Sequence, residues 1–249
     1  MFRAELVKLK RSSTWLIAGI LPLLAVTTGT INLANNRDVL NAGWASFTSQ
    51  VVLFYGLLFF SLGIGLLAST VWRVEHRGTN WNLLLTTMTR PSGLVLAKVG
   101  VIVIVTAFMQ LVLIVGTLAS GVLVLRLNGA LPWQFVLVGV LAVVTALPLI
   151  AIQSLLSMLL KSFAAPVAIC LLGCVIGIAT VTSATLRPLS YLLPQAINTR
   201  ALTLGSTAAL AESGGLTVGD VAPLLLTSAA LAAIFLLATV TAVRVIKLR

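Results

Sequence analysis

Residues 99–125 read VGVIVIVTAFMQLVLIVGTLASGVLVL, a stretch of 27 residues without a charged side chain. An α-helix needs about 20 apolar residues to cross the roughly 30 Å hydrocarbon core of a bilayer. A helix also satisfies its own backbone hydrogen bonds in lipid. Five more stretches lack charge: 12–36, 39–72, 127–160, 162–186 and 221–243. The sequence therefore predicts six membrane-spanning helices, near residues 14–34, 47–72, 99–124, 134–160, 163–183 and 222–243.

The composition supports this fold class. Of the 249 residues, 59% are apolar and 8% are charged, and the mean hydropathy is +1.14. Soluble domains carry about 25% charged residues, so a soluble, disordered or collagen-like chain is excluded. A membrane β-barrel would show segments of about ten alternating residues, and none is present. We expect an all-α integral membrane protein with a single transmembrane domain over 1–249.

The basic residues predict the orientation. Twelve of the 16 lysines and arginines fall in the segments on one side of the predicted spans: 1–13, 73–98, Lys161 and 244–249. The side richer in lysine and arginine is normally cytoplasmic, so both termini are expected inside a multi-pass membrane protein. The net charge of +11 is then explained by topology and by contact with anionic membrane lipids, rather than by nucleic acid.

Two segments outside the spans are expected to meet the membrane. Residues 1–13 place Phe2, Leu6 and Leu9 on one face of a helix and most basic residues elsewhere, which is typical of an interfacial helix. The outer segment 184–221 contains apolar pieces too short to span. It is predicted to form a re-entrant or interfacial hairpin, with a plain surface loop as the alternative.

The inner loop 73–98 is predicted to contain a short amphipathic helix. Gly78 and Thr79 supply a break and an N-cap, and Pro91 ends the helix. Between them, an apolar stripe recurs at helical spacing, formed by Trp81, Leu84, Leu85 and Met88. The stripe is interpreted as a docking surface; the alternative is a connector that rests on lipid.

The sequence offers no source of energy or catalysis of its own. It lacks the G-x-x-x-x-G-K-[ST] motif, and we expect no cofactor, no metal site and no ionisable residue deep in a span. His76 is expected to be solvated, and the five acidic residues fall in separate segments. Cys170 and Cys174 are interpreted as small packing residues. Work must therefore come from a partner.

Polar and small residues inside the spans suggest helix contacts. Gln50, Gln110 and Gln153 either link helices or line a transport path. Gly173 and Gly177 form a GxxxG pattern, which allows two helices to approach closely. We interpret it as the dimer face.

Glu75, Gly78 and Thr79, followed by Leu84, Leu85, Thr86 and Lys98, resemble the "E-x-x-G-T … L-L-T-T-P … K" run of type-2 ABC exporter permeases. The chain departs from that run at Met88-Thr89-Arg90-Pro91, where the family brings proline in sooner. The resemblance extends over the full length, since the family has six spans, an N-terminal interfacial helix, a coupling helix and a re-entrant hairpin before the sixth span.

The resemblance implies a bacterial cell-membrane permease that pairs with a second permease, identical or paralogous. A separate cytosolic ABC ATPase, which carries the ATP and Mg, would dock on Glu75, Gly78, Thr79, Trp81, Leu84, Leu85 and Met88. The small size is most similar to permeases that export antimicrobial peptides or drugs for resistance. Alternatives are a polysaccharide or lipid-linked export permease, or a membrane scaffold or sensor that does not transport.

Overall fold

The computed structural model describes residues 2–10, 12–36, 39–40, 43–77, 81, 91–206 and 216–245. None of these residues forms a β-strand. Six helices in this part are long and apolar enough to cross a membrane: Thr14–Asn35, Trp44–Arg73, Pro91–Val124, Trp133–Leu159, Ala164–Thr182 and Val218–Val245. The predicted all-α fold with six candidate spans is confirmed.

Several of these spans are built from more than one element. The first and fifth are the single helices α2 (Thr14–Asn35) and α9 (Ala164–Thr182), and the sixth is α12 (Val218–Val245). The second joins α3 (Trp44–Phe54), a π-helical turn η1 (Tyr55–Phe59) and α4 (Phe60–Arg73). The third joins α6 (Pro91–Ala119) to the π-helical η2 (Ser120–Val124), and the fourth joins α7 (Trp133–Thr145) to α8 (Leu147–Leu159). Outside the spans lie α1 (Phe2–Leu9), the 3-10 helix η3 (Arg187–Tyr191) and α10 (Pro194–Thr203).

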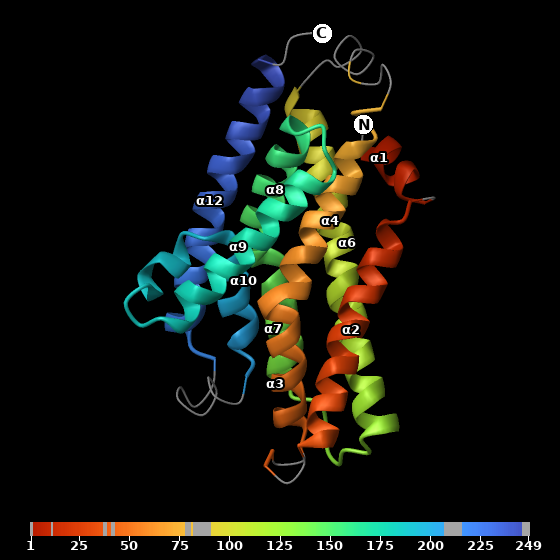
Figure 1. Ribbon diagram of the computed structural model, residues 1–249, viewed down its shortest axis with the longest axis vertical. Coiled ribbons are helices and arrows are strands. Elements are labelled where there is room, and N and C mark those ends of the chain that lie inside the picture. Colours follow the sequence, from red (N-terminus) through yellow and green to blue (C-terminus); the bar gives the residue numbers. More distant parts are fainter. Residues whose placement is uncertain are drawn as a thin grey trace.

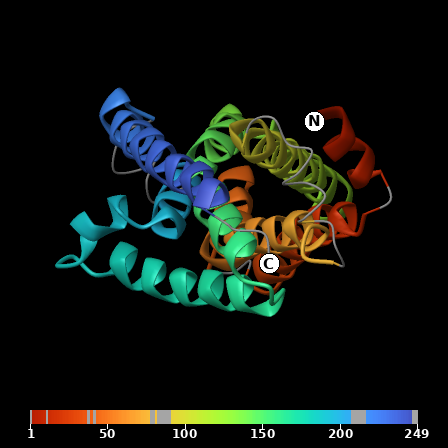
Figure 2. The same cartoon turned by 90° about the horizontal axis from the view of Figure 1, so that it is seen from above.

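The helices form an elongated bundle, with α1 and the C-terminal end of α12 at the same end (Figure 1). We call this the terminal end. Helix α4 packs against α2, α6, α8 and α9, whereas α1 packs mainly on α6. Seen along the long axis, α12 lies at the periphery on the side away from α1 (Figure 2). An even number of spans returns a chain to the side on which it began, and α1 and the C-terminal end of α12 do lie at the same end of the bundle.

The third span differs from its predicted bounds. Helix α6 begins at Pro91, so the last eight residues assigned to the inner loop are helical. Proline is well suited to the first turn of a helix, because its nitrogen has no hydrogen to leave unpaired. As a result Lys98 lies about two turns inside α6 and is fully buried. Lys98, which the sequence assigns to the inner loop, is therefore a buried residue near the start of α6 rather than deep in the span.

The described part of the segment between α9 and α12 contains two short helices, η3 and α10. η3 and α10 lie beside the bundle at mid-height, above the lower ends of α2, α3, α6 and α7 (Figure 1). The Thr199 hydroxyl donates to the Gly56 carbonyl at 2.8 Å, so α10 is seated on the π-helical turn η1. π-helical turns leave carbonyl groups without their usual helical partner. The re-entrant or interfacial hairpin over 184–221 stays a prediction.

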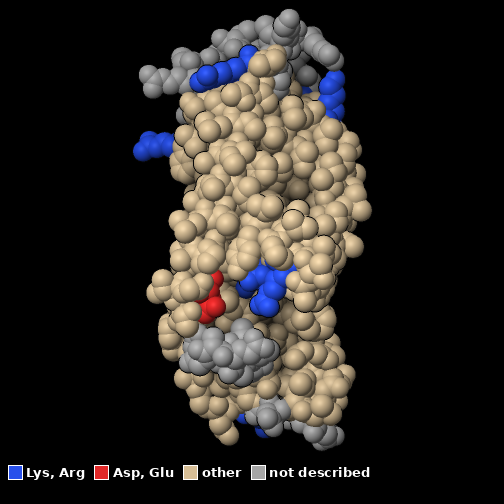
Figure 3. Space-filling model, turned by 90° about the vertical axis from the view of Figure 1, so that its left-hand side faces the viewer, with Lys and Arg blue, Asp and Glu red and all other residues tan. Residues whose placement is uncertain are grey.

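The half-buried Arg200 of α10 has partners within the same segment. The Arg200 guanidinium donates to the Ser190 hydroxyl at 2.9 Å and to the Tyr191 hydroxyl at 2.7 Å. It also lies 4.2 Å from the centroid of the Tyr191 ring. Figure 3 shows basic side chains partway along a largely uncharged face on this side of the molecule. Such contacts lower the cost of holding a cation at this depth.

Candidate coupling site

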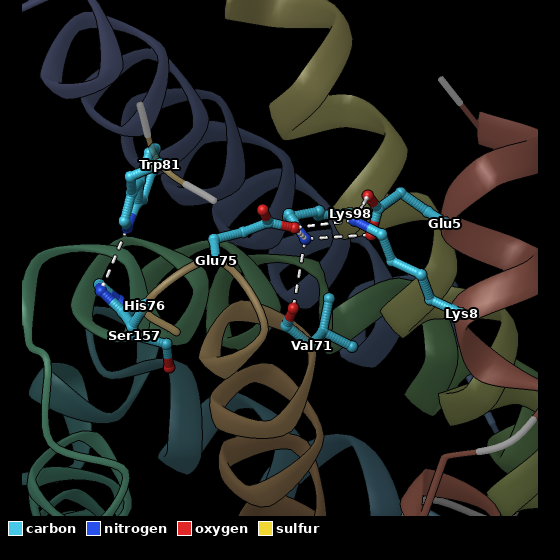
Figure 4. Close-up of polar contacts among 8 residues, drawn as sticks. All are labelled: Glu5, Lys8, Val71, Glu75, His76, Trp81, Lys98 and Ser157. Atoms are coloured by element: carbon cyan, nitrogen blue, oxygen red, sulfur yellow. Dashed lines mark hydrogen bonds and ion pairs between the residues drawn. The ribbon is translucent and has the colours of Figure 1, made fainter. Parts of the chain in front are cut away.

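Four charged side chains, from α1, α6 and the turn after α4, form a cluster at the terminal end of the bundle (Figure 4). Lys98 of α6 lies at its centre, where Nζ is 3.0 Å from Glu5 Oε2 and 2.9 Å from Glu75 Oε1. Lys8 binds the same two carboxylates, at 2.7 Å from Glu5 Oε1 and 2.9 Å from Glu75 Oε1. We call these four residues the Lys98 cluster. It joins α1, α6 and the turn after α4.

All three N–H donors of the Lys98 ammonium have a hydrogen-bond acceptor. A lysine has three N–H donors, and Lys98 donates to Glu5, to Glu75 and to the Val71 carbonyl at 3.2 Å. Its side chain is 0% exposed, and Nζ lies 5.1 Å from the centroid of the Trp72 ring. A buried charge is tolerated when its partners are complete, and removing one partner is costly.

The cluster also controls the protonation of Glu75. Burial by itself raises the pKa of this carboxyl, but the charges and hydrogen bonds of Lys98 and Lys8 outweigh it, so the pKa is lowered from its usual value. A carboxyl with a depressed pKa in the folded state stabilises the fold at neutral pH. That contribution is lost as the pH falls through the lowered pKa. The ion pairs of Glu75 are therefore intact at neutral pH.

The cluster closes the base of the inner loop. Glu75 follows α4 directly and Lys98 lies in α6, so their ion pair joins the two helices between which the loop 78–90 runs. Helix α1 is held to the same point through Glu5. Glu75 is 3% exposed, so its carboxylate is enclosed by the cluster.

A second contact set holds the start of the loop. The Trp81 indole N–H donates to His76 Nδ1 at 3.1 Å, and His76 Nε2 lies 2.8 Å from the Ser157 carbonyl oxygen. Trp81 also stacks on Trp72, with ring centroids 6.2 Å apart. A carbonyl only accepts and an indole N–H only donates, so this arrangement requires a neutral His76 protonated at Nε2. His76 is thus an internal link between the loop and α8, and the prediction that it is solvated is wrong.

Two of the predicted coupling residues are among the residues that the structure describes. Glu75 belongs to the Lys98 cluster and Trp81 is packed on Trp72. The other predicted members lie outside the described residues: Gly78, Thr79, Leu84, Leu85 and Met88. Their part in docking an ATPase stays a prediction.

Sequence reasoning missed the partnership of Glu5 with Glu75. The two acidic residues are 70 positions apart and fall in separate segments of the sequence. In the structure, however, both contact Lys8 and Lys98. The sequence contained one indication of this contact, since Glu5 is the only acidic residue in the basic N-terminal segment. Within the part of the chain that the structure describes, no group of three His, Cys, Asp or Glu residues is placed to hold a metal.

The three glutamines differ in their surroundings. Gln50 Oε1 accepts from Asn32 Nδ2 at 2.6 Å, so Gln50 links α3 to α2. Gln110 and Gln153 are 3% and 1% exposed. Both amide atoms of Gln110 and the Gln153 Oε1 have no hydrogen-bond partner among the described residues. A role for these two in a transport path stays a prediction.

The two glycines of the GxxxG pattern face their own chain. A Cβ built on Gly173 would collide with the Gln195 side chain, and one on Gly177 would lie 3.2 Å from the Ala196 nitrogen. Both neighbours belong to α10. The pattern therefore provides close packing of α9 on α10, and this placement does not fit the predicted dimer face. The exposed face of α9 instead presents Leu172 and Ile176, which are 64% and 53% exposed.

Replacing Gly173 and Gly177 with leucine is expected to displace α10. Overpacking costs about 1–3 kcal/mol at one site, so the melting temperature of the purified protein should fall. A control variant with Ala168→Leu and Ala179→Leu also enlarges two side chains, on the exposed face of α9, and should melt like the parent. If the glycine variant instead kept a normal melting temperature but no longer formed a dimer, Gly173 and Gly177 would be the dimer face.

Comparison with known proteins gives a family. The family described as "ABC-2 family transporter protein" matches residues 1–177 of the chain. No curated protein and no solved structure matched it. The matched region includes α1, the first four spans and most of the fifth, and thus every described residue of the Lys98 cluster. The chain belongs to the ABC-2 family of transporters, as a transmembrane permease component without an ATPase domain.

Proposed function

We propose that this permease is the membrane half of an exporter driven by a separate cytosolic ATPase, which docks on the loop 78–90. ABC permeases pair with ATPase subunits, so a surface for that partner is needed. The observation that carries the assignment is the Lys98 cluster, because it joins α1, α4 and α6 at the base of this loop. In this proposal a movement of the ATPase shifts the loop, and the cluster passes the shift to three helices.

The orientation follows from the same assignment. The terminal end of the bundle, with the loop and most basic residues, lies in the cytoplasm, in agreement with the charge distribution. We place the protein in a bacterial cell membrane with both termini inside. A second permease, identical or paralogous, completes the transporter by packing on exposed apolar residues of α9 such as Leu172 and Ile176.

The proposed cargo is hydrophobic or amphipathic, of the antimicrobial-peptide or drug type. The spans are uncharged over most of their length, which suits an apolar cargo better than a charged one. Channels for polysaccharides are often lined with aromatic rings, and only 6% of the residues here are aromatic. This supports the peptide or drug class over the polysaccharide class.

A photo-cross-linking amino acid at position 84 tests the docking proposal. In intact cells, the probe at Leu84 should yield an adduct with a P-loop ATPase subunit, identified by mass spectrometry. The connection between η2 and α7 lies at the other end of the bundle (Figure 1). The same probe at Asn128, an exposed residue of this connection, should give no such adduct. An ATPase adduct at 128 alone would invert the orientation, and no ATPase adduct at either position would reject the proposal.

A further inference from the structure

A cavity opens on the side of the bundle at the terminal end. Its volume is about 550 Å³, and its walls come from α2, the C-terminal part of α4 and the start of α9. The lining combines three basic residues, three hydroxyl groups and a larger apolar set: Lys8, Arg73 and Arg77; Ser12, Ser13 and Thr70; Leu16, Ile17, Ile20, Leu21, Leu66, Val74 and Phe163. No acidic residue is among the described residues that line it.

The basic groups of the cavity are not all neutralised. Lys8 shares the two carboxylates of the Lys98 cluster. Arg73 and Arg77 are exposed and form no ion pair with any described carboxylate. Arg73 is held at the cavity by the Phe163 ring, whose centroid is 5.3 Å from the guanidinium carbon. The cavity mouth therefore carries two guanidinium groups without a carboxylate partner among the described residues, and such groups bind phosphate oxygens well.

The apolar wall continues onto the outer surface of the bundle. Leu16 and Ile20 are 64% and 52% exposed and lie one turn apart on α2. In a span helix this exposed surface meets the acyl chains of the bilayer. The cavity thus presents positive charge and hydroxyl groups beside the membrane boundary, and apolar side chains deeper along the same helix.

We propose that this cavity binds one anionic phospholipid. Its phosphate lies between Arg73 and Arg77, with Ser12, Ser13 and Thr70 as further polar neighbours, and an acyl chain follows Leu16 and Ile20 along α2. Charge complementarity selects an anionic headgroup over a zwitterionic one, and the exposed apolar wall selects a lipid over a soluble phosphate. The site does not depend on the direction of transport or on the ATPase.

Bound phospholipid is measured on the purified full-length chain by native mass spectrometry. The detergent contains equal amounts of phosphatidylglycerol and phosphatidylcholine with identical acyl chains. Each basic residue near an anionic surface contributes roughly a fivefold gain in binding. The variant Arg73→Gln with Arg77→Gln should thus lose about 25-fold in preference for phosphatidylglycerol. Arg73→Lys with Arg77→Lys keeps the charges and should keep most of the preference.

A matched control separates this site from general surface charge. Lys10→Gln with Lys161→Gln removes two cations from the same end of the bundle, and neither residue lines the cavity. This control should bind like the parent. Equal preference in the parent and the arginine-to-glutamine variant would overturn the proposal. If glycerol 3-phosphate competed as strongly as the lipid, the cavity would be a site for soluble phosphate instead. If lipid were bound to monomers but absent from dimers, a second copy of the chain would cover this face.

Discussion

Replacing Lys98 with methionine is expected to destabilise the protein by about 3–5 kcal/mol, because Glu5 and Glu75 are left buried without their central cation. Both carboxylates are nearly inaccessible, at 6% and 3% exposure, so water cannot replace the lost ammonium. Lys8 remains, but its side chain is 40% exposed and reaches the carboxylates from the outside. The melting temperature in detergent should fall by on the order of 10 °C, and Lys10→Met, an exposed cation at the same end, should leave it unchanged.

A triple variant separates stability from coupling. Lys98→Met with Glu5→Met and Glu75→Met removes the buried charges together, and apolar replacement of a complete buried ion cluster is often neutral for stability. We expect most of the lost stability to return while ATP-driven transport stays lost, because the charged link between α1, α4 and α6 is gone. Full transport in the stable triple variant would show that the Lys98 cluster serves folding alone.

Replacing Leu84 and Met88 with alanine is expected to release the ATPase from the permease. Helix-in-groove contacts use apolar anchors at this spacing, and buried anchors cost about 2 kcal/mol or more when truncated. One such anchor already corresponds to a roughly 30-fold loss of affinity. Co-purification of the ATPase should therefore drop sharply and transport should be lost, while insertion and melting temperature stay normal.

The matched control removes equal apolar volume elsewhere. Leu96 and Leu111 are 58% and 55% exposed on α6, so Leu96→Ala with Leu111→Ala truncates two lipid-facing side chains. This control should retain both the ATPase and transport. If the loop variant behaves like the control, the stripe rests on lipid and the docking surface lies elsewhere.

The spans were predictable because their cause is local. A long stretch without charge, such as 99–125, must be helical and buried in lipid whatever its neighbours are. The largest difference in the bounds arose at Pro91, which was taken as the end of the loop helix and is the first residue of α6. Either reading is compatible with a proline, since it both stops a preceding helix and starts a following one.

The glycine pattern shows what the sequence of a single helix does not determine. Gly173 and Gly177 share a face of α9 and allow close approach, as predicted, but a spacing along one helix does not say which helix approaches. That partner is α10 of the same chain. The departure from the family run at Met88-Thr89-Arg90-Pro91 likewise carried no information about His76. In the structure, His76 contacts both Trp81 and the Ser157 carbonyl.

The sequence by itself determined the membrane class, the six spans and the absence of a P-loop motif, because hydropathy and short motifs act within one segment. Only the tertiary structure decided that Glu5, Glu75 and Lys98 meet, since contacts across 23 to 93 positions depend on how the helices pack. The free energy of a buried charge is set by its partners, and those partners exist only after α1, α4 and α6 have come together.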